Sequence, residues 1–162
     1  LLKASRRRNE EKYRMQLAEA KVVLGFSMEL ATEQVANGRY FVYEQPWAAT
    51  SWKDESVTAA KSLPGVTLVK GNQCVFGQQT IGPDGEQGLV AKPTGWLTNS
   101  PEVAKRVGLL RQGGHEHVHL LEGRAKAAEK YPTKLVKAIL RGIKAQLGIG
   151  AGLHALDAGH NR

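Results

Sequence analysis

The chain has 162 residues, of which 41% are hydrophobic and 23% are charged, a composition typical of one folded domain rather than of a disordered chain. Its single cysteine excludes an intrachain disulfide, and no apolar run reaches the length of a membrane span. We therefore expect an intracellular protein of the nucleus or cytoplasm with no membrane partner. The formal net charge of +8 favours an anionic partner, with DNA or RNA the first expectation, because long-range attraction raises the local concentration of such a partner.

The first half of the chain alternates helix-type and strand-type patterns. In chain order, the predicted elements are a long helix over 9–37, a strand over 39–44, a short helix over 50–63 and a strand over 66–69 that could resume at 74–76. The long helix is predicted because apolar residues recur at three- and four-residue steps, and residues 1–8 form a basic extension before it. The strand over 39–44 is aromatic and β-branched, so we expect it to be buried on both faces.

The second half begins with a polar, glycine-rich loop over 77–91. It continues with a strand around 96–98, a helix opened by Ser100-Pro101, an extended segment at 115–121, a helix opened by Pro132 and a glycine-rich flexible tail over 148–162. Because helices and strands alternate, we expect an α/β fold over residues 9–147. The prediction is a partial, Rossmann-like, three-layer domain in which helices cover a mainly parallel sheet of few strands.

The first candidate site is the end of the strand over 39–44. Glu44 ends this strand, at the edge of the sheet where open α/β folds bind ligands. Its carboxylate could accept a hydrogen bond from an amino group or contact a ring nitrogen of a nucleobase. The alternative is that Glu44 caps the adjacent helix or pairs with a nearby arginine.

Basic and short polar residues supply further candidate contacts. Lys92 and Thr94 lie on a rigid turn before the strand at 96–98, where an ammonium group and a hydroxyl could contact a phosphate. Basic residues also cluster at 6–8, at 126–130 and along the last helix. The residues expected to contact nucleic acid are Glu44, Gln45, Lys92, Thr94, Asn99, Arg124, Lys126, Lys137 and Arg141. The alternative for the charges is a solubilising surface, and for the turn it is ordinary loop polarity.

Three histidines at alternate positions form a candidate zinc site. His115, His117 and His119 would share one face of a strand, and two of them could bind zinc. The remaining ligands would have to come from elsewhere in the chain, from Cys74, His154 or His160. The alternatives are a polar strand face near the surface or contact with phosphate. Neither a catalytic base nor a nucleophile motif surrounds Cys74, so a buried structural thiol is predicted there.

Several segments, taken in their order along the chain, resemble a known family. They are Glu44-Gln45-Pro46-Trp47, Cys74-Val75-Phe76-Gly77, Lys92-Pro93-Thr94, Thr98-Asn99-Ser100, Gly114-His115 with His117 and His119, and Tyr131-Pro132 with Leu135. This series resembles a segment in the polyproteins of copia-type retrotransposons from unicellular eukaryotes, over residues 15–147. The resemblance implies that the chain, which starts at Leu1, is a piece of such a polyprotein and that the rest of the polyprotein is a partner.

That segment is in turn similar to the C-terminal half of phage-type cytosine-5 DNA methyltransferases. In these enzymes a Glu-Asn/Gln-Pro strand end contacts the target cytosine, and Glu44 matches its glutamate. Their cofactor loop and Pro-Cys nucleophile precede the helix that begins this chain, and neither motif is present in the sequence. Cys74 follows the Glu-Gln-Pro strand, so it does not match that nucleophile. The resemblance therefore implies no cofactor in this chain, and S-adenosylmethionine only with an upstream segment.

These observations predict a non-catalytic, methyltransferase-like segment that contacts nucleic acid, with no catalytic residue assigned. Two alternatives stay open. One is the C-terminal half of an active cytosine-5 DNA methyltransferase, in which Glu44 would hold a flipped base. The other is a protein-interaction scaffold with no nucleic-acid role.

Overall fold

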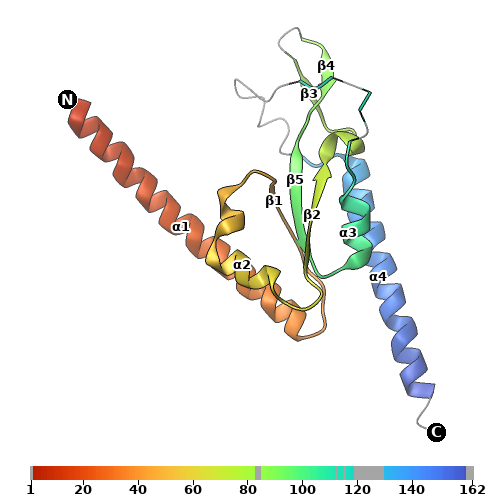
Figure 1. Ribbon diagram of the computed structural model, residues 1–162. Helices are drawn as coiled ribbons and strands as arrows, with labels where there is room; N and C mark the ends of the chain where they lie inside the picture. The colour runs from red at the N-terminus through yellow and green to blue at the C-terminus, as the bar shows by residue number, and fades with distance from the viewer. Residues whose placement is uncertain (1, 83–84, 112, 115, 119–129, 160–162) are drawn as a thin grey trace.

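Helices and a small sheet make up the fold (Figure 1). The computed structural model describes residues 2–82, 85–111, 113–114, 116–118 and 130–159. The elements are α1 (Leu2–Ala36), β1 (Val42–Pro46), the 3-10 helix η1 (Thr50–Lys53), α2 (Glu55–Lys61), β2 (Thr67–Asn72), the 3-10 helix η2 (Gln73–Phe76), β3 (Gln79–Ile81), β4 (Gln87–Leu89), β5 (Pro93–Thr98), α3 (Pro101–Val107) and α4 (Thr133–Gly159). None of the helices in the described ranges has the length and hydrophobicity needed to cross a membrane.

The main sheet has three strands in the order β1-β5-β2, and β5 runs antiparallel to both neighbours. Trp96 of β5 lies opposite Glu44 on one side and opposite Val69 on the other. β3 and β4 form a separate antiparallel hairpin. The predicted mainly parallel sheet is therefore wrong, and the structure gives no support for a Rossmann-like fold. The prediction failed because β1 and β2, which do run in the same direction, are separated by β5 rather than paired.

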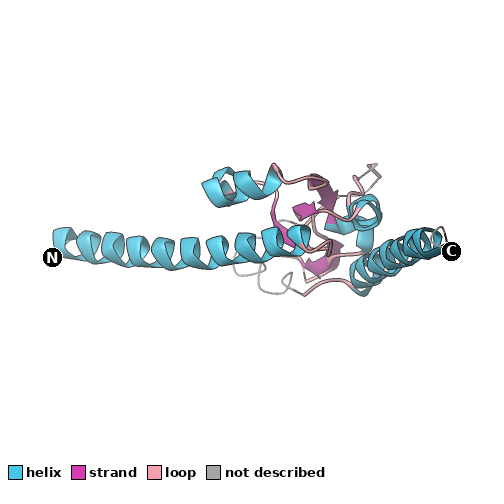
Figure 2. Ribbon diagram, turned by 90° about the horizontal axis from the view of Figure 1, so that it is seen from below, coloured by secondary structure: helices cyan, strands magenta, loops and turns pink. Residues whose placement is uncertain are grey.

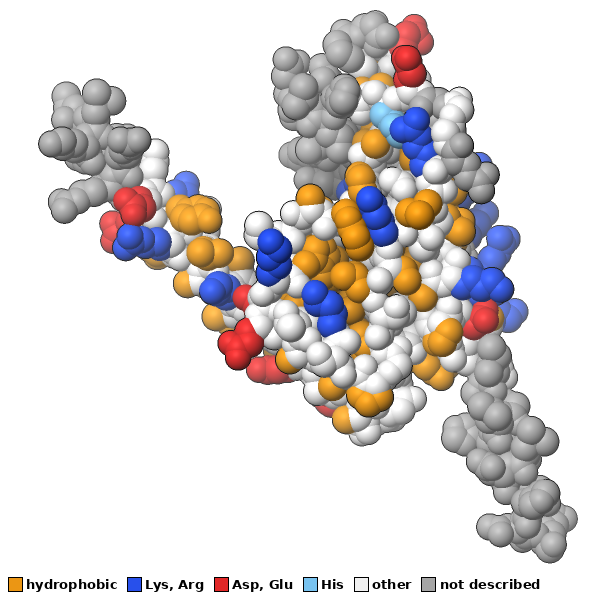
Figure 3. Space-filling model, in the orientation of Figure 1, with side chains coloured by type: hydrophobic (Ala, Val, Ile, Leu, Met, Phe, Trp, Pro, Cys, Tyr) orange, Lys and Arg blue, Asp and Glu red, His pale blue; other side chains and the backbone are white. Residues whose placement is uncertain are grey.

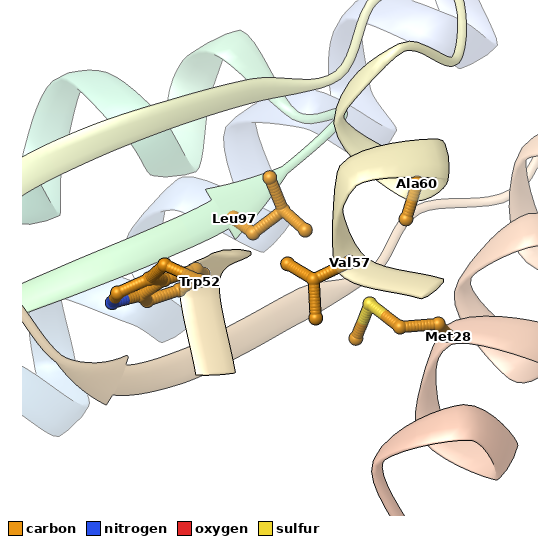
Figure 4. Packing of buried hydrophobic residues seen from close by; sticks show 5 residues of the cluster. All are labelled: Met28, Trp52, Val57, Ala60 and Leu97. Carbon is orange, nitrogen blue, oxygen red and sulfur yellow. The ribbon is translucent and has the colours of Figure 1, made fainter. Parts of the chain in front are cut away.

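Helices cover both faces of the main sheet, so the fold has three layers. α1 and α2 lie on one side, and α3 and α4 lie on the other (Figure 2). The first core cluster fills the α1–α2 side and contains Met28, Trp52, Val57, Ala60 and Leu97 (Figure 4). The second cluster fills the α3–α4 side and contains Phe76, Trp96, Val103, Val107 and Leu135. Successive residues of β5 thus point to opposite cores, as strand alternation requires.

Helix starts follow local signals in the sequence. Ser100 caps α3 as predicted, because its Oγ accepts a hydrogen bond from the backbone N–H of Val103 at 3.2 Å. α2 begins at Glu55, later than the predicted start at residue 50, and its cap is Asp54. The Asp54 carboxylate accepts hydrogen bonds from the hydroxyl and from the backbone N–H of Ser56. Both bonds lower the pKa of Asp54, and the one from the hydroxyl has the larger effect.

The long helix α1 reaches beyond the core that it supports. It begins at Leu2, so the predicted basic extension over 1–8 is mostly part of the helix. Apolar residues recur along α1 at three- and four-residue steps, and of these Met28 and Ala31 are buried, whereas Tyr13 and Leu17 are exposed. Figure 1 shows why, since the N-terminal half of α1 projects away from the sheet.

Other element predictions need correction. The strand predicted over 39–44 lies at 42–46 and forms an edge of the sheet rather than a strand buried on both faces. Residues 74–76 belong to η2, and the predicted loop over 77–91 contains the β3–β4 hairpin. The tail expected from residue 148 onward continues α4 to Gly159. Each glycine in a helix interior costs about 1 kcal/mol relative to alanine, so the glycines at 148, 150 and 152 weaken this part of α4 without excluding a helix.

Candidate nucleic-acid interface

Glu44 lies in the middle of β1 and not at the end of a strand, as was predicted. It is held by a tyrosine from far along the chain. The Tyr131 hydroxyl donates a hydrogen bond to Glu44 Oε2 at 2.9 Å. Tyr131 stands just before α4, so this bond ties the start of α4 to the sheet. Burial raises the pKa of Tyr131, and the hydrogen bond to Glu44 and its negative charge raise it further. The hydroxyl therefore stays protonated, as a donor, throughout the neutral range.

An aromatic ring and an ammonium group complete this cluster. The rings of Tyr131 and Trp96 have their centroids 6.2 Å apart and are tilted by 51°. Lys92 Nζ lies 5.8 Å from the centroid of the Tyr131 ring, within the range of a cation–π interaction. Glu44 is half-buried, and no described residue donates a hydrogen bond to its Oε1. The cluster thus combines a carboxylate oxygen open to a donor, a cation and a partly exposed aromatic ring.

Thr94 supports this cluster from inside the protein. Its side chain is fully buried, its hydroxyl accepts a hydrogen bond from Gln73 Nε2 at 3.0 Å, and it donates to the backbone carbonyl of Lys92 at 3.2 Å. The backbone N–H of Gln73 donates to the same carbonyl at 3.2 Å. In this arrangement the Thr94 hydroxyl fixes the turn that carries Lys92 and does not face solvent, where a phosphate would bind.

Neither Gln45 nor Asn99 joins the cluster around Glu44. Gln45 points to the α1–α2 face because successive strand residues alternate, and its Nε2 donates to the Tyr43 hydroxyl at 2.7 Å. Asn99 accepts from the backbone N–H of Phe41 at 3.0 Å and donates to the carbonyl of Arg39 at 2.8 Å. The Asn99 side chain therefore anchors the chain where it enters β1.

A row of basic residues runs along the outer face of α4. Its members are Lys134, Lys137, Arg141 and Lys144, and all four are exposed. The three- and four-residue steps place them on one face of the helix, away from the buried Leu135 and Gly142. Residues 131–148 include no acidic residue, and none of the four basic residues forms an ion pair within the described part of the chain. We call these four residues the α4 basic row.

Positive charge is not confined to α4. Figure 3 shows Lys and Arg side chains gathered on the side where α3 and α4 lie, and others spread over the visible face. Two predicted contacts, Arg124 and Lys126, lie outside the described residues. Of the predicted contacts, the described part brings Glu44 and Lys92 together and places Lys137 and Arg141 next to each other on α4.

The predicted zinc site is only partly visible. His115 and His119 lie outside the described residues, as do the side chains of His154 and His160. His117 is described, and its Nδ1 lies 3.2 Å from a guanidinium nitrogen of Arg111. Among the described residues there is no group of three or more potential metal ligands. Cys74 is buried, as predicted for a structural thiol.

Tyr131 holds Glu44, a role that no pattern in the sequence predicted. The signal was weak, because a tyrosine before Pro132 reads locally as the start of a helix. No known protein family, curated protein or solved structure matches this chain significantly. The Glu44–Lys92–Tyr131 cluster and the α4 basic row are therefore the features of this chain that bear on its function.

Proposed function

We propose that this chain binds nucleic acid without catalysing a reaction of its own, as a methyltransferase-like segment of a retrotransposon polyprotein. The α4 basic row carries the proposal. From Lys134 to Lys144 it extends about 15 Å along the helix, at 1.5 Å per residue. The phosphates of one DNA strand follow each other every 3.4 Å or so along the axis, so this length matches about four of them.

The position of the row relative to Glu44 supports the same proposal. Tyr131 lies three residues before Lys134, so the cluster that contains Glu44 and Lys92 adjoins the N-terminal end of the row. Phosphate contacts along α4 would position the strand, and the side chains of the cluster would face its bases or sugars. This division follows the general pattern in which backbone contacts set register and polar groups near bases set preference.

The test compares two variants of equal charge. One replaces the α4 basic row with glutamine at all four positions, and the other replaces the exposed residues Lys12, Lys21, Lys53 and Lys105 with glutamine. Both lower the net charge from +8 by four, to +4. Binding to a fluorescent DNA duplex and to a single strand at low salt would be measured by anisotropy. We expect the row variant to lose on the order of tenfold or more in affinity and the control to change far less.

Equal losses in the two variants would mean that net charge alone attracts the nucleic acid and that α4 has no special part. A folded wild-type chain that binds neither nucleic acid at low salt would contradict the proposed function itself. Circular dichroism of all three proteins would establish that the comparison is between folded chains.

A second candidate is the C-terminal half of an active cytosine-5 DNA methyltransferase, in which Glu44 holds the base. It is favoured by one observation, the Glu44 Oε1 oxygen to which no described residue donates. This oxygen could accept a hydrogen bond from the exocyclic amino group of cytosine, which thymine lacks. The candidate predicts tighter binding of a single strand with an unstacked cytosine than of the same strand with thymine.

Glu44→Gln tests this second candidate, because it keeps the shape of the side chain but turns half of the carboxylate into a donor. The preference for cytosine should disappear in Glu44→Gln and persist in Gln45→Asn, a matched change on the opposite face of the same strand. A wild-type chain that binds both strands equally would remove the support for a base contact at Glu44.

A further inference from the structure

β1 is an open edge of the sheet in the described part of the chain, because β5 is its only strand partner there. The backbone N–H of Trp47 donates to the carbonyl of Pro93 in β5 at 2.9 Å, so the backbone groups of Trp47 point toward β5. In an antiparallel pair, every second residue directs its N–H and C=O toward the partner. Val42 and Glu44 are out of phase with Trp47, so their backbone groups point away from β5.

The last residue of β1 limits how far this edge extends. Pro46 has no N–H to donate, and its carbonyl accepts a hydrogen bond from Trp52 Nε1 at 2.9 Å. The open edge is therefore short, and its two donors and two acceptors belong to Val42 and Glu44. Unpaired strand edges of this kind accept further strands.

Apolar grooves lie on both faces of the open edge. A groove of about 700 Å³ separates α1 from β1 and η1, and its lining includes Leu17, Val23, Leu24 and Tyr43. A second groove of about 500 Å³ lies between the start of β1 and the α3–α4 layer, and its lining includes Val42, Val103, Ile139, Ile143 and Leu147. Figure 2 shows α1 and α4 on opposite sides of the sheet. A strand added to β1 would alternate its side chains between these two grooves.

Each groove continues one of the two cores past the last strand. Leu24 and Tyr43 line the first groove and also pack against the first core cluster. Val103 belongs to the second cluster, and Ile139 packs against it, while both line the second groove. Side chains entering the grooves would thus meet surfaces that already cover β1 and β5. The open edge of β1 suits an extended occupant, and the two grooves suit apolar side chains on both of its faces.

We propose that β1 binds an extended segment of a partner polypeptide, which pairs with Val42 and Glu44 as a fourth strand. The segment is short, free of proline at its pairing positions and rich in valine or isoleucine on both faces. Backbone hydrogen bonds supply the pairing, and the two grooves supply the side-chain preference, as in other cases of strand addition. No residue of the α4 basic row lines either groove, so the strand would leave the proposed phosphate contacts of α4 free. Glu44 takes part in both interactions, through its backbone groups here and through its side chain in the cluster with Tyr131.

The probe for the test is a synthetic hexapeptide with four central valine and isoleucine residues between two lysines. The same peptide with a central proline is the control ligand. Two pairs of matched variants test the grooves. Val23→Asn changes a groove residue that is 64% exposed, and Val22→Asn changes its neighbour, 73% exposed and outside the groove lining. Ile143→Asn and Val136→Asn form the second pair, since both residues are 39% exposed and only Ile143 lines a groove.

We expect the hexapeptide, and not its proline form, to slow hydrogen exchange at the amides of Val42 and Glu44. Val23→Asn and Ile143→Asn should each weaken peptide binding by about tenfold, the equivalent of losing most of one buried aliphatic side chain. Their matched controls should bind like the wild type. Absence of protection in a folded chain, or equal losses in groove and control variants, would overturn the proposal. If hydrogen exchange at these amides slows as protein concentration rises without peptide, and sedimentation velocity shows dimers, the occupant is a second copy of the chain and the proposal is overturned.

Discussion

Removing the Tyr131 hydroxyl should release the start of α4 from β1 at a measurable cost. In Tyr131→Phe the ring stays beside Trp96, and only the hydrogen bond to Glu44 is lost. A hydrogen bond to a charged group contributes about 1.5–3 kcal/mol when it is shielded from water. Tyr131 is 41% exposed, so solvent competes for both partners and we expect about 1 kcal/mol.

A double-mutant cycle separates this bond from other effects of each change. The free energy of unfolding would be measured by urea titration, with tryptophan fluorescence as the signal, for the wild type, Tyr131→Phe, Glu44→Ala and the double variant. The cycle should return a coupling of about 1 kcal/mol. Additive losses with no coupling would refute the idea that this bond ties α4 to the sheet.

The same bond has a pH signature whose sign follows from the raised pKa of Tyr131. A group with a raised pKa in the folded state contributes stability fully below its unfolded pKa and loses it as the pH rises through the folded pKa. The advantage of the wild type over Tyr131→Phe should therefore be constant from neutral pH up to about pH 10, the ordinary tyrosine value, and fall above it. An advantage that stays constant through the alkaline range would contradict the assignment.

Two substitutions test how the layers are held together. Ser100→Ala removes the cap of α3, and it also removes the hydroxyl that donates to Gln146 Oε1 at 2.9 Å. The free energy of unfolding, measured by urea titration, should fall by about 1–2 kcal/mol. Ser100→Thr should retain most of the cap. Gly95→Ala would place a Cβ 2.5 Å from the Trp52 ring, so overpacking should cost about 1–3 kcal/mol and shift the melting temperature down; an unchanged melting temperature would contradict this packing.

Local signals in the sequence predicted helices better than strand pairing. Ser100 and Pro101 mark the start of α3, because capping depends on neighbours within one turn. The direction of β5 depends on how the chain returns between β1 and β2, and no pattern within five or six residues records that choice. The alternation of helix and strand therefore predicted helices on both faces of a sheet correctly, but the predicted parallel pairing of the strands was wrong.

The sequence predicted which residues of the candidate site are exposed where a helix face decides exposure. It did not predict side-chain positions that depend on a partner distant in the sequence. Lys137 and Arg141 could be placed on the outer face of α4 because the helical period fixes them opposite Leu135. The buried position of Thr94 depends on Gln73, and the bond from Tyr131 to Glu44 spans 87 residues. Contacts over such separations cannot be read from a local pattern.

The salt dependence of DNA binding shows whether α4 contacts phosphates. For duplex DNA, each phosphate contact adds about 0.9 to the negative slope of log affinity against log salt concentration. If the α4 basic row makes these contacts, replacing its four residues should make the slope shallower by up to about 3.6, and the control variant of equal charge should keep the wild-type slope. A wild-type slope near zero, or the same slope in the row variant, would mean that α4 does not bind the phosphates.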